Sequence, residues 1–363
     1  MLCSFNNFKL GVIKEMEGLV MNLAWKEMKK NKVRFLILGS IIFLVSFLTF
    51  IISGLANGLS QDNAALIKDL PKGQFYMAED ADGTFNLSRI DSDLQQKVIS
   101  KEKEAVAFSI QMGFLNDQDD KQQSVAFVTS TESTLFSNVH QDEVLLDSSL
   151  QDKGIQVGDI LTNNQYSGKF IVKGFVEQKK YSHAPVAYIS EEAYQEIYRV
   201  ADKQLIFVPN SEPNDIKGLQ AYSNKEFLNT IPSYNAEQLS LNMIIWFLVV
   251  ISGMLFAIFF YMMNVQKIGL YGILKAIGLK TSKLFKMIWT QMAIITIFSL
   301  VVSVSLSQLF NIVAPKGMPF TLTIGTTTQL SVVFLLIGFI GATLSGMQIK
   351  KIEPLQAIQQ GEA

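Results

Sequence analysis

Four long stretches without a single Asp, Glu, Lys or Arg constrain this chain of 363 residues more than any other feature. They occupy residues 35–55, 243–263, 287–310 and 329–349. A helix needs about 20 apolar residues to cross roughly 30 Å of hydrocarbon. Four uncharged runs of that length are hard to explain as buried helices of a soluble protein. The sequence therefore predicts an integral membrane α-helical protein, with spans at residues 35–56, 243–264, 287–310 and 329–349.

The distribution of charge predicts how these spans are oriented. Lysines and arginines gather before the first span, between the second and third, and after the fourth, and such clusters favour the cytoplasmic side. Residues 57–242 hold 27 Asp and Glu against 16 Lys and Arg, a net charge of −11, whereas the rest of the chain carries a net +10. We expect a multi-pass protein of the plasma membrane, with both termini cytoplasmic and residues 57–242 extracellular.

The remaining segments complete the predicted domain plan. Residues 1–34 form a cytoplasmic extension followed by a basic, amphipathic helix at the membrane interface, and the sequence MNLAWKEMKKNKVRF suggests Met21 as a natural start. Residues 265–286 form a cytoplasmic loop, residues 311–328 a short extracellular loop, and residues 350–363 a cytoplasmic tail. The lipid bilayer is thus one partner of the chain.

Residues 57–242 are predicted to form one large mixed α/β domain between the first and second spans. Short strand-like runs lie at residues 124–130, 143–149, 169–177, 184–190 and 204–210, and a further strand is expected within 154–161. Residues 91–103 and 190–201 are predicted helices, with Ser190 as the N-cap of the second.

The sequence offers little chemistry. It has two histidines and one cysteine, with no zinc-protease motif, cysteine pair or nucleophile elbow. We therefore expect no catalytic residue, no resident metal and no intrinsic cofactor, and a net charge of −1 favours no nucleic-acid partner. The spans lack the intramembrane charges of proton- or sodium-driven carriers. Any energy for transport should come from a separate subunit.

The loop sequence YGILKAIGLKTSKLF, residues 271–285, superficially resembles a phosphate-binding loop. Its glycines are too far apart, and Leu279 separates Gly278 from the lysine that follows. The pattern instead predicts a short amphipathic helix that stops at Gly278, with Thr281 or Ser282 capping the next helix. Such a helix is either a docking element for a partner or a passive interfacial helix. The docking candidates are Tyr271, Leu274, Lys275, Ile277, Gly278 and Lys280.

The loop QKIGLYGILKAIGLKTSKLF and the tail KKIEPLQAIQQG resemble the FtsX-like, MacB-like family of ABC transporter permeases. The order of one span, a large outer domain and three spans is similar too. Gln266 and Lys267 stand where Arg-Glu is common in that family, and Lys275 replaces an arginine. Within the family, LAWKEMKKNKVRFL, SGLANGLSQDNA and YSHAPVAY are most similar to HrtB-type haem-efflux permeases of Gram-positive bacteria.

The resemblance implies a permease homodimer with two copies of a separate ABC ATPase subunit, which binds the ATP. It also implies haem as the transported ligand, taken from the outer leaflet. Haem requires an axial ligand and an apolar slot, and the candidates are Tyr181, His183, Tyr234, Glu237 and Met243. An exporter of a peptide, lipid or antibiotic is a close variant. A signalling scaffold that relays ATPase motion to an extracellular partner is the alternative class.

Small residues in the first span suggest a dimer contact. Gly39, Ser40, Ser46, Ser53 and Gly54 would permit close helix approach. We therefore expect the first span to form the dimer face.

Overall fold

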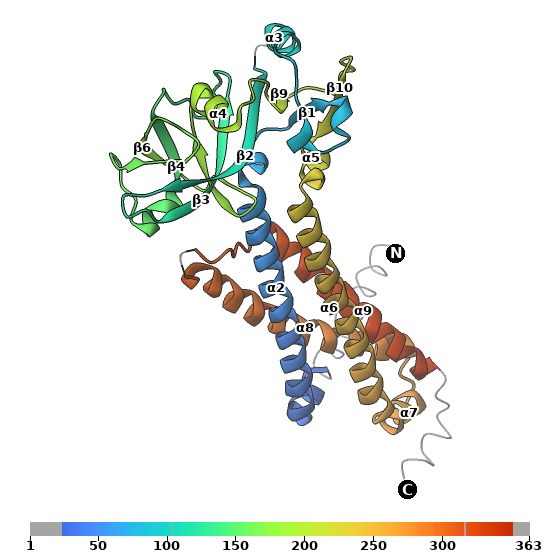
Figure 1. Ribbon diagram of the computed structural model, residues 1–363. Helices are drawn as coiled ribbons and strands as arrows, with labels where there is room; N and C mark the ends of the chain where they lie inside the picture. The colour runs from blue at the N-terminus through green and yellow to red at the C-terminus, as the bar shows by residue number, and fades with distance from the viewer. Residues whose placement is uncertain (1–23, 103, 316, 351–363) are drawn as a thin grey trace, which may run out of the picture. The chain divides into compact units, whose positions relative to one another are not determined.

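The computed structural model describes residues 24–102, 104–315 and 317–350 (Figure 1). Its contacts divide the chain into two compact units. The α/β unit is formed mainly by Ala56–Ser240. The membrane unit contains the described residues up to Leu55, then Leu241–Pro315 and the residues from Phe320 onward. Each unit has hydrophobic clusters of its own.

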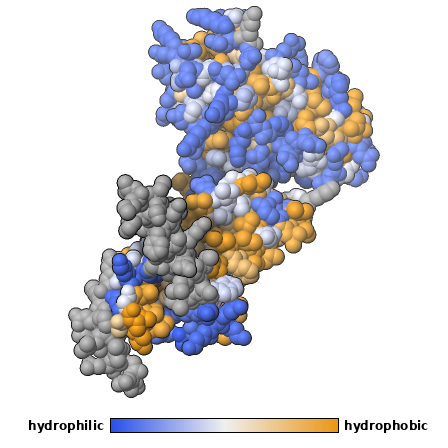
Figure 2. Space-filling model, turned by 180° about the vertical axis from the view of Figure 1, so that it is seen from behind, coloured by the Kyte–Doolittle hydropathy of each residue, from blue (hydrophilic) through white to orange (hydrophobic). Residues whose placement is uncertain are grey.

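Four helices are long and apolar enough to cross a membrane, as the sequence predicts. They are α2 (Lys32–Lys68), α6 (Pro232–Val265), α8 (Thr281–Val313) and α9 (Ile324–Lys350). Hydrophobic residues gather over these helices, whereas hydrophilic residues prevail over the α/β unit (Figure 2). Helices α2 and α6 continue past the apolar runs and supply their polar ends to the α/β unit. Before α2, residues 24–30 are helical as well.

Small polar residues join α2 to α8 within the membrane unit. The hydroxyl groups of Ser46 and Ser303 lie 2.6 Å apart, and Ser299 Oγ donates to the carbonyl oxygen of Gly39 at 2.9 Å. Gly54 packs so tightly against an aromatic ring that an added Cβ would lie 2.3 Å from it. The small residues expected to form a dimer face are therefore largely used inside one chain, because they let α8 and the following loop approach α2.

The α/β unit is built on one mixed sheet. The strand order is β10-β1-β9-β2-β3-β8-β4-β6-β5, with β7 paired to β8. The strands are β1 (Gly73–Ala78), β2 (Val106–Asn116), β3 (Gln122–Ser130), β4 (Glu143–Asp147), β5 (Ile160–Leu161), β6 (Phe170–Val176), β7 (Lys180–Tyr181), β8 (Ala184–Tyr188), β9 (Leu205–Pro209) and β10 (Leu219–Ser223). The pairs β3–β8 and β4–β6 are parallel, and the other pairs are antiparallel.

Three helices complete this unit: α3 (Ser92–Lys101), α4 (Glu191–Tyr198) and α5 (Asn224–Thr230). The predicted N-cap is confirmed, since Ser190 Oγ accepts from the amide of Ala193. The strand expected within residues 154–161 is mostly wrong. Gly154 and Gly158 have positive φ angles, which form turns, and only two residues remain extended.

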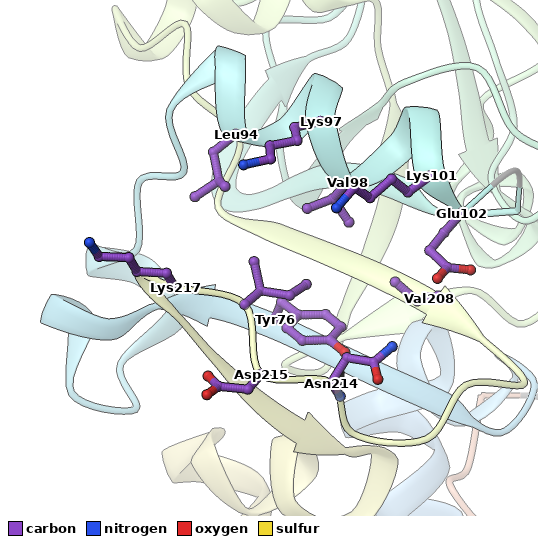
Figure 3. A pocket seen from close by; sticks show the side chains of 11 residues that line it. Tyr76, Leu94, Lys97, Val98, Lys101, Glu102, Val208, Asn214, Asp215 and Lys217 are labelled. Atoms are coloured by element: carbon purple, nitrogen blue, oxygen red, sulfur yellow. Dashed lines mark hydrogen bonds between the residues drawn. The ribbon is translucent and has the colours of Figure 1, made fainter.

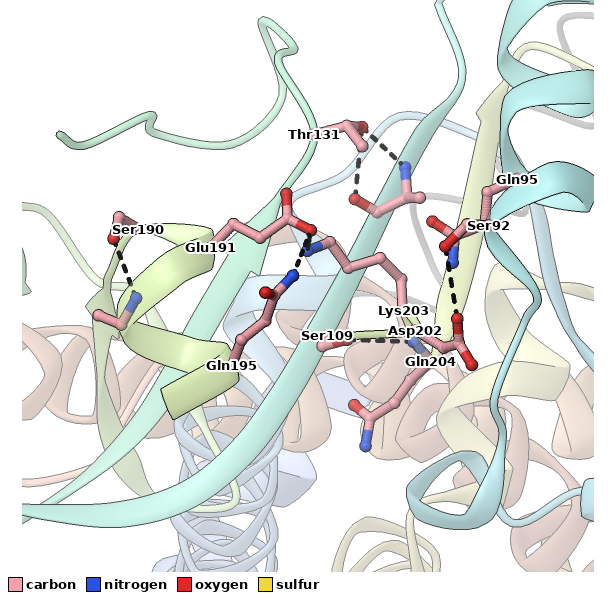
Figure 4. A network of polar contacts seen from close by, with 12 residues as sticks. Ser92, Gln95, Ser109, Thr131, Ser190, Glu191, Gln195, Asp202, Lys203 and Gln204 are labelled. Atoms are coloured by element: carbon pink, nitrogen blue, oxygen red, sulfur yellow. Dashed lines mark hydrogen bonds and ion pairs between the residues drawn. The ribbon is translucent and has the colours of Figure 1, made fainter. Parts of the chain in front are cut away.

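Side chains tie β9 to its neighbours in the α/β unit (Figure 4). Lys203 is 2% exposed and forms an ion pair of 2.8 Å with Glu191 on α4. The amide of Gln204 donates to Ser109 Oγ at 3.0 Å, and its side-chain oxygen accepts from the amide of Ile110. Buried polar groups are costly unless they are bonded, so these contacts fix the start of β9 against β2 and α4.

Helix α7 (Ile268–Ala276) lies between α6 and α8, where the sequence predicts a short amphipathic helix. Its end is as expected: Gly278 has a φ of +94°, its amide donates to Lys275 O, and the next amide donates to Leu274 O. The predicted cap of α8 is wrong. Thr281 is already helical, and Lys280 occupies the N-cap position without a side-chain bond.

Candidate functional site

A strained two-residue turn presents His183 in the α/β unit. Strands β7 and β8 pair up to Tyr181 and Ala184, so only Ser182 and His183 connect them. Both connecting residues have positive φ angles, 50° and 62°. A turn of this kind favours Asn-Gly, because other residues with a Cβ strain the left-handed conformation. Residues in strained backbone conformations cluster at functional sites, so His183 is a candidate functional residue.

The turn is held by a kink in α2. The backbone is non-helical at Ala64 (φ −143°, ψ 23°), and the carbonyl oxygen of Asn63 accepts the amide of Ser182 at 2.7 Å. The Asn63 side chain is fully buried, and its oxygen accepts from Ser233 Oγ at 3.2 Å. The kink therefore docks the turn onto α2 and fixes the direction of an amide side chain beside it.

His183, Asn63 and Glu237 converge beside this turn. His183 Nε2 lies 2.7 Å from Glu237 Oε1 and 3.2 Å from Asn63 Nδ2, and Asn63 Nδ2 donates to Glu237 Oε2 at 3.2 Å. An ionised carboxylate only accepts, so with Glu237 ionised the Nε2–H group of His183 and the Nδ2–H group of Asn63 both donate to Glu237. Within the described ranges no hydrogen-bond partner reaches Nδ1. A carboxylate on one imidazole nitrogen orients the ring and directs the other nitrogen at a ligand, which is the arrangement of a metal-ligating histidine.

Ion pairs surround this cluster on both sides of the turn. Lys180 Nζ lies 2.7 Å from Asp62 Oδ1, and Lys179 Nζ lies 2.7 Å from Asp69 Oδ2. These contacts join the β7 strand and the residue preceding it to the polar end of α2. The side chains of His183 and Glu237 remain 35% and 31% exposed. The cluster is therefore fixed in position yet open to a ligand.

The structure brings together three of the five residues predicted for the ligand. His183 and Glu237 are in direct contact, and Tyr234 accepts from Ser60 Oγ at 3.2 Å on the same helices. Met243 is exposed farther along α6 and belongs to the membrane unit. Asn63 was missed. Its only signal is an asparagine within SGLANGLSQDNA, at the polar end of a long helix.

Tyr181 does not fit the predicted role of a surface ligand. It is 4% exposed, and its ring meets Phe85 edge to face at 5.9 Å. Burial raises the pKa of the Tyr181 phenol well above its ordinary value. Ligation of haem iron by tyrosine requires the phenolate, so this environment opposes it.

A hollow of about 490 Å³ lies elsewhere in the α/β unit, beside α3 (Figure 3). Lys97 and Lys101 reach into it from α3, Lys217 lies across from them, and the buried ring of Tyr76 forms its floor. None of the predicted site residues lines it. In the part of the chain that the structure describes, no group of three or more His, Cys, Asp or Glu side chains is placed to hold a metal ion.

Helix α7 presents an apolar surface different from the predicted set. Tyr271 is fully buried and donates to Asn264 Oδ1 at 2.9 Å, so it holds α7 to the spans and cannot contact a partner. Leu274 is half-buried against the core of the membrane unit. Leu270, Ile273 and Ile277 are exposed at helical spacing, with Ile277 at 74%. We call these three residues the α7 stripe.

Known proteins resemble the chain over most of its length. Residues 242–354 match the FtsX-like permease C-terminal family. A Staphylococcus haemolyticus protein, provisionally assigned as the hemin transport system permease HrtB, is 30% identical over 93% of this chain and 99% of its own. A protein with the same provisional assignment in Staphylococcus epidermidis is 29% identical over 94% and 100%.

Among solved structures, the periplasmic region of MacB from Actinobacillus actinomycetemcomitans matches 44% of this chain and 91% of its own. The identity is 12% and the TM-score 0.33, too low for equating residues. The relatives that match along nearly their whole length confirm the FtsX-like resemblance: the chain belongs to the FtsX-like family of ABC transporter permeases, together with the HrtB permeases.

Proposed function

We propose that this chain is the permease subunit of an ABC-type efflux system that expels haem from the outer leaflet of the plasma membrane. A separate ATPase subunit binds and hydrolyses the ATP, and two permeases act with two ATPase copies. The net charges of −11 and +10 favour an extracellular α/β unit and a cytoplasmic α7. The relatives assigned to hemin transport support haem as the substrate.

The observation that carries the haem assignment is the strained turn at His183. Asn-Gly would form this turn without strain, yet the chain places a histidine there and braces it with Glu237 and Asn63. Haem iron accepts an imidazole ligand, and a braced imidazole loses little freedom on binding. In this role His183 ligates the iron, whereas Glu237 fixes the ring and Asn63 fixes Glu237.

The α7 stripe supports docking of the ATPase subunit. Leu270, Ile273 and Ile277 form an exposed apolar face on a short helix between two spans. A groove on a partner can cover such a face. Lys275, Gly278 and Lys280, which the sequence also suggests for docking, would lie at its margin. Tyr271 and Leu274 act by holding the helix in place.

The test is haemin tolerance in cells that lack this permease and carry its variants beside the partner ATPase. The wild-type chain should restore growth on graded haemin, and His183→Ala should lower the tolerated concentration at least about tenfold, as expected when an essential ligand is lost. His140→Ala is the matched control, because His140 is the only other histidine and lies exposed in the same unit.

Unchanged tolerance after deletion of the permease would refute haem export. A scaffold that only relays motion to an extracellular partner would then explain the family membership better. Full activity of His183→Ala alongside a clear deletion phenotype would leave haem export standing and move its ligand elsewhere.

A further inference from the structure

Glu27 is the only carboxylate among the described residues of the membrane unit. It lies on the helical segment 24–30, which is rich in lysine and precedes α2. Lysines on this segment offer abundant partners at the surface. The Glu27 side chain is instead 10% exposed and turned into the protein. A lone acid buried in this way needs a specific explanation, because burial of a charge is costly unless it is paired.

Lys267 pairs with Glu27 inside the protein. Its ammonium group forms an ion pair with Glu27 Oε1, is 6% exposed, and lies 5.2 Å from the centre of the Phe35 ring. Burial lowers the pKa of Lys267, and Glu27 opposes that shift. Gln291 on α8, fully buried, donates to Glu27 Oε2 at 2.7 Å. The pair thus joins segment 24–30, the start of α2, the beginning of α7 and α8.

A second set of hydrogen bonds begins at the backbone of Lys267. Lys267 occupies the N-cap position of α7, and its carbonyl oxygen accepts the amide of Tyr271. The Tyr271 hydroxyl donates to Asn264 Oδ1 at 2.9 Å, and Asn264 Nδ2 donates to Ser345 Oγ on α9 at 2.6 Å. All these groups are buried or nearly so. The beginning of α7 is therefore linked to segment 24–30 through Lys267, and to α6 and α9 through Tyr271 and Asn264.

We propose that the Glu27–Lys267 ion pair is the joint that makes segment 24–30 and α7 move as one rigid body when the ATPase subunit closes. This inference rests on the proposed function, because it assumes that α7 receives the motion. Glu27 and Lys267 are positioning residues, since they act through α7. A push on the α7 stripe then moves segment 24–30 and the start of α2 at once.

The choice of residues favours a joint over simple stabilisation. A buried ion pair often contributes no more stability than apolar residues of similar volume, yet removal of one partner is strongly destabilising. Apolar burial is non-directional. A buried pair of opposite charges is directional and specifies one register of the two segments that carry it. A fixed register is what a segment needs to transmit a displacement.

The test measures the distance between two spin labels by electron paramagnetic resonance. Lys30→Cys and Ala276→Cys carry the labels, both at exposed positions, in a Cys3→Ser background. The full permease with its ATPase subunit is reconstituted in nanodiscs, with and without ATP and vanadate. The labelled permease that keeps the Glu27–Lys267 pair should give one narrow distribution of label–label distances, and ATP should not alter it. Glu27→Gln and Lys267→Met should each broaden the distance distribution at least about twofold, because segment 24–30 and α7 can then adopt more than one relative position.

The charge swap Glu27→Lys with Lys267→Glu should restore the narrow distance, and Lys32→Met, an exposed lysine at the start of α2, should leave it unchanged. ATP hydrolysed per haemin exported should rise at least about tenfold in the two neutralised variants, a loss of coupling typical of a broken joint. A merely structural role would lower assembly without changing this ratio in the complexes that form.

Three results would overturn the proposal. The first is a label–label distance that shifts with ATP in the permease with the native pair. The others are a distance distribution in the neutralised variants as narrow as in that permease, or one in the charge-swap variant as broad as in the single variants. If the single variants fail to assemble, the double variant Glu27→Gln with Lys267→Met is measured instead, since it leaves no unpaired buried charge. A broad distance distribution in the double variant supports the proposal, and a narrow one refutes it. A complex that exports no haemin would refute the proposed function alone, because the distances do not depend on haem.

Discussion

The two compact units each contain a carboxylate paired with a basic side chain, and the pairs differ in exposure. His183 and Glu237 in the α/β unit are 35% and 31% exposed, and the histidine sits in a strained turn. Lys267 and Glu27 in the membrane unit are 6% and 10% exposed, between helical segments. Both pairs join elements far apart in the sequence. Only the first can receive a ligand without dismantling its surroundings.

This difference separates two kinds of function. An exposed pair contributes little to stability, because water screens it and competes for its hydrogen bonds. Such a pair can therefore serve ligand binding at little cost in stability. A buried pair cannot bind anything, but removing one partner leaves an uncompensated charge. The first pair is therefore suited to recognition and the second to transmission of motion.

The largest expected effect is loss of stability on removal of the buried acid. Glu27→Ala should lower the free energy of unfolding by about 3–5 kcal/mol, since Lys267 is left buried and unpaired. The corresponding change in the exposed pair, Glu237→Ala, should cost less, about 1–2 kcal/mol, because water screens the pair while the buried Asn63 amide loses an acceptor. Denaturant unfolding of the detergent-solubilised permease measures both. Equal losses would erase the distinction drawn between the two pairs.

The Glu27→Ala variant should also respond to pH. Burial already lowers the pKa of Lys267 in the folded protein, and removal of Glu27 takes away the charge that opposes this shift. The folded state then binds fewer protons than the unfolded state, so stability rises with pH up to the ordinary lysine range. Part of the lost stability should return between neutral pH and pH of about 10. A free energy of unfolding that does not change with pH would show that water reaches the Lys267 ammonium group in this variant.

The next effect concerns the α7 stripe. Ile273→Asp with Ile277→Asp should weaken association with the ATPase subunit by about 2 kcal/mol, or roughly 30-fold, as loss of an apolar contact centre does. Co-purification at graded ATPase concentration measures it. Ile273→Leu with Ile277→Leu keeps the face apolar and should bind normally. Normal assembly of the Asp variant would place docking elsewhere.

A smaller effect distinguishes strain from ligation within the turn. Ser182→Asn suits the left-handed conformation and should stabilise the protein by about 0.5 kcal/mol. Ser182 uses only its backbone amide to bond Asn63, so haemin binding should not change. His183→Gly relaxes the neighbouring position and should abolish binding. If both variants bind haemin alike, the turn serves only the fold.

The smallest effect sets the baseline for exposed pairs. Lys173 and Glu143 lie 2.8 Å apart, with the lysine side chain 51% exposed. Lys173→Met should change the free energy of unfolding by about 0.5 kcal/mol or less. A larger loss would mean that exposed pairs in this unit contribute more than assumed, and the comparison with Glu27 would need to be rescaled.

The sequence predicts the membrane part of the fold well, because uncharged runs of this length have few alternatives. It also locates Gly278 and the Ser190 cap, where local geometry decides. It does not reveal β1 (Gly73–Ala78) or β2 (Val106–Asn116), since burial on both faces removes the alternating pattern along all of β1 and over residues 106–110 of β2. The strand within 154–161 fails for the opposite reason: its two glycines form turns.

The candidate site is only partly visible in the sequence. His183 and Glu237 carry chemistry that can be recognised by residue type. Asn63 matters because α2 kinks beside it, and a kink without proline leaves no signal. The Glu27–Lys267 pair escapes for a similar reason. In the sequence Lys267 is one of many basic residues near the spans, and only tertiary packing shows which of them is buried.

Haem binding at His183 is tested most directly by a haemin titration of the purified full-length permease, followed by the Soret band. The wild-type chain and His140→Ala should give the same saturable spectrum of imidazole-ligated haem. His183→Ala should lose that spectrum and bind at least about tenfold more weakly, because a ligand and its orientation are lost together. An unaltered spectrum in His183→Ala would contradict the proposed site.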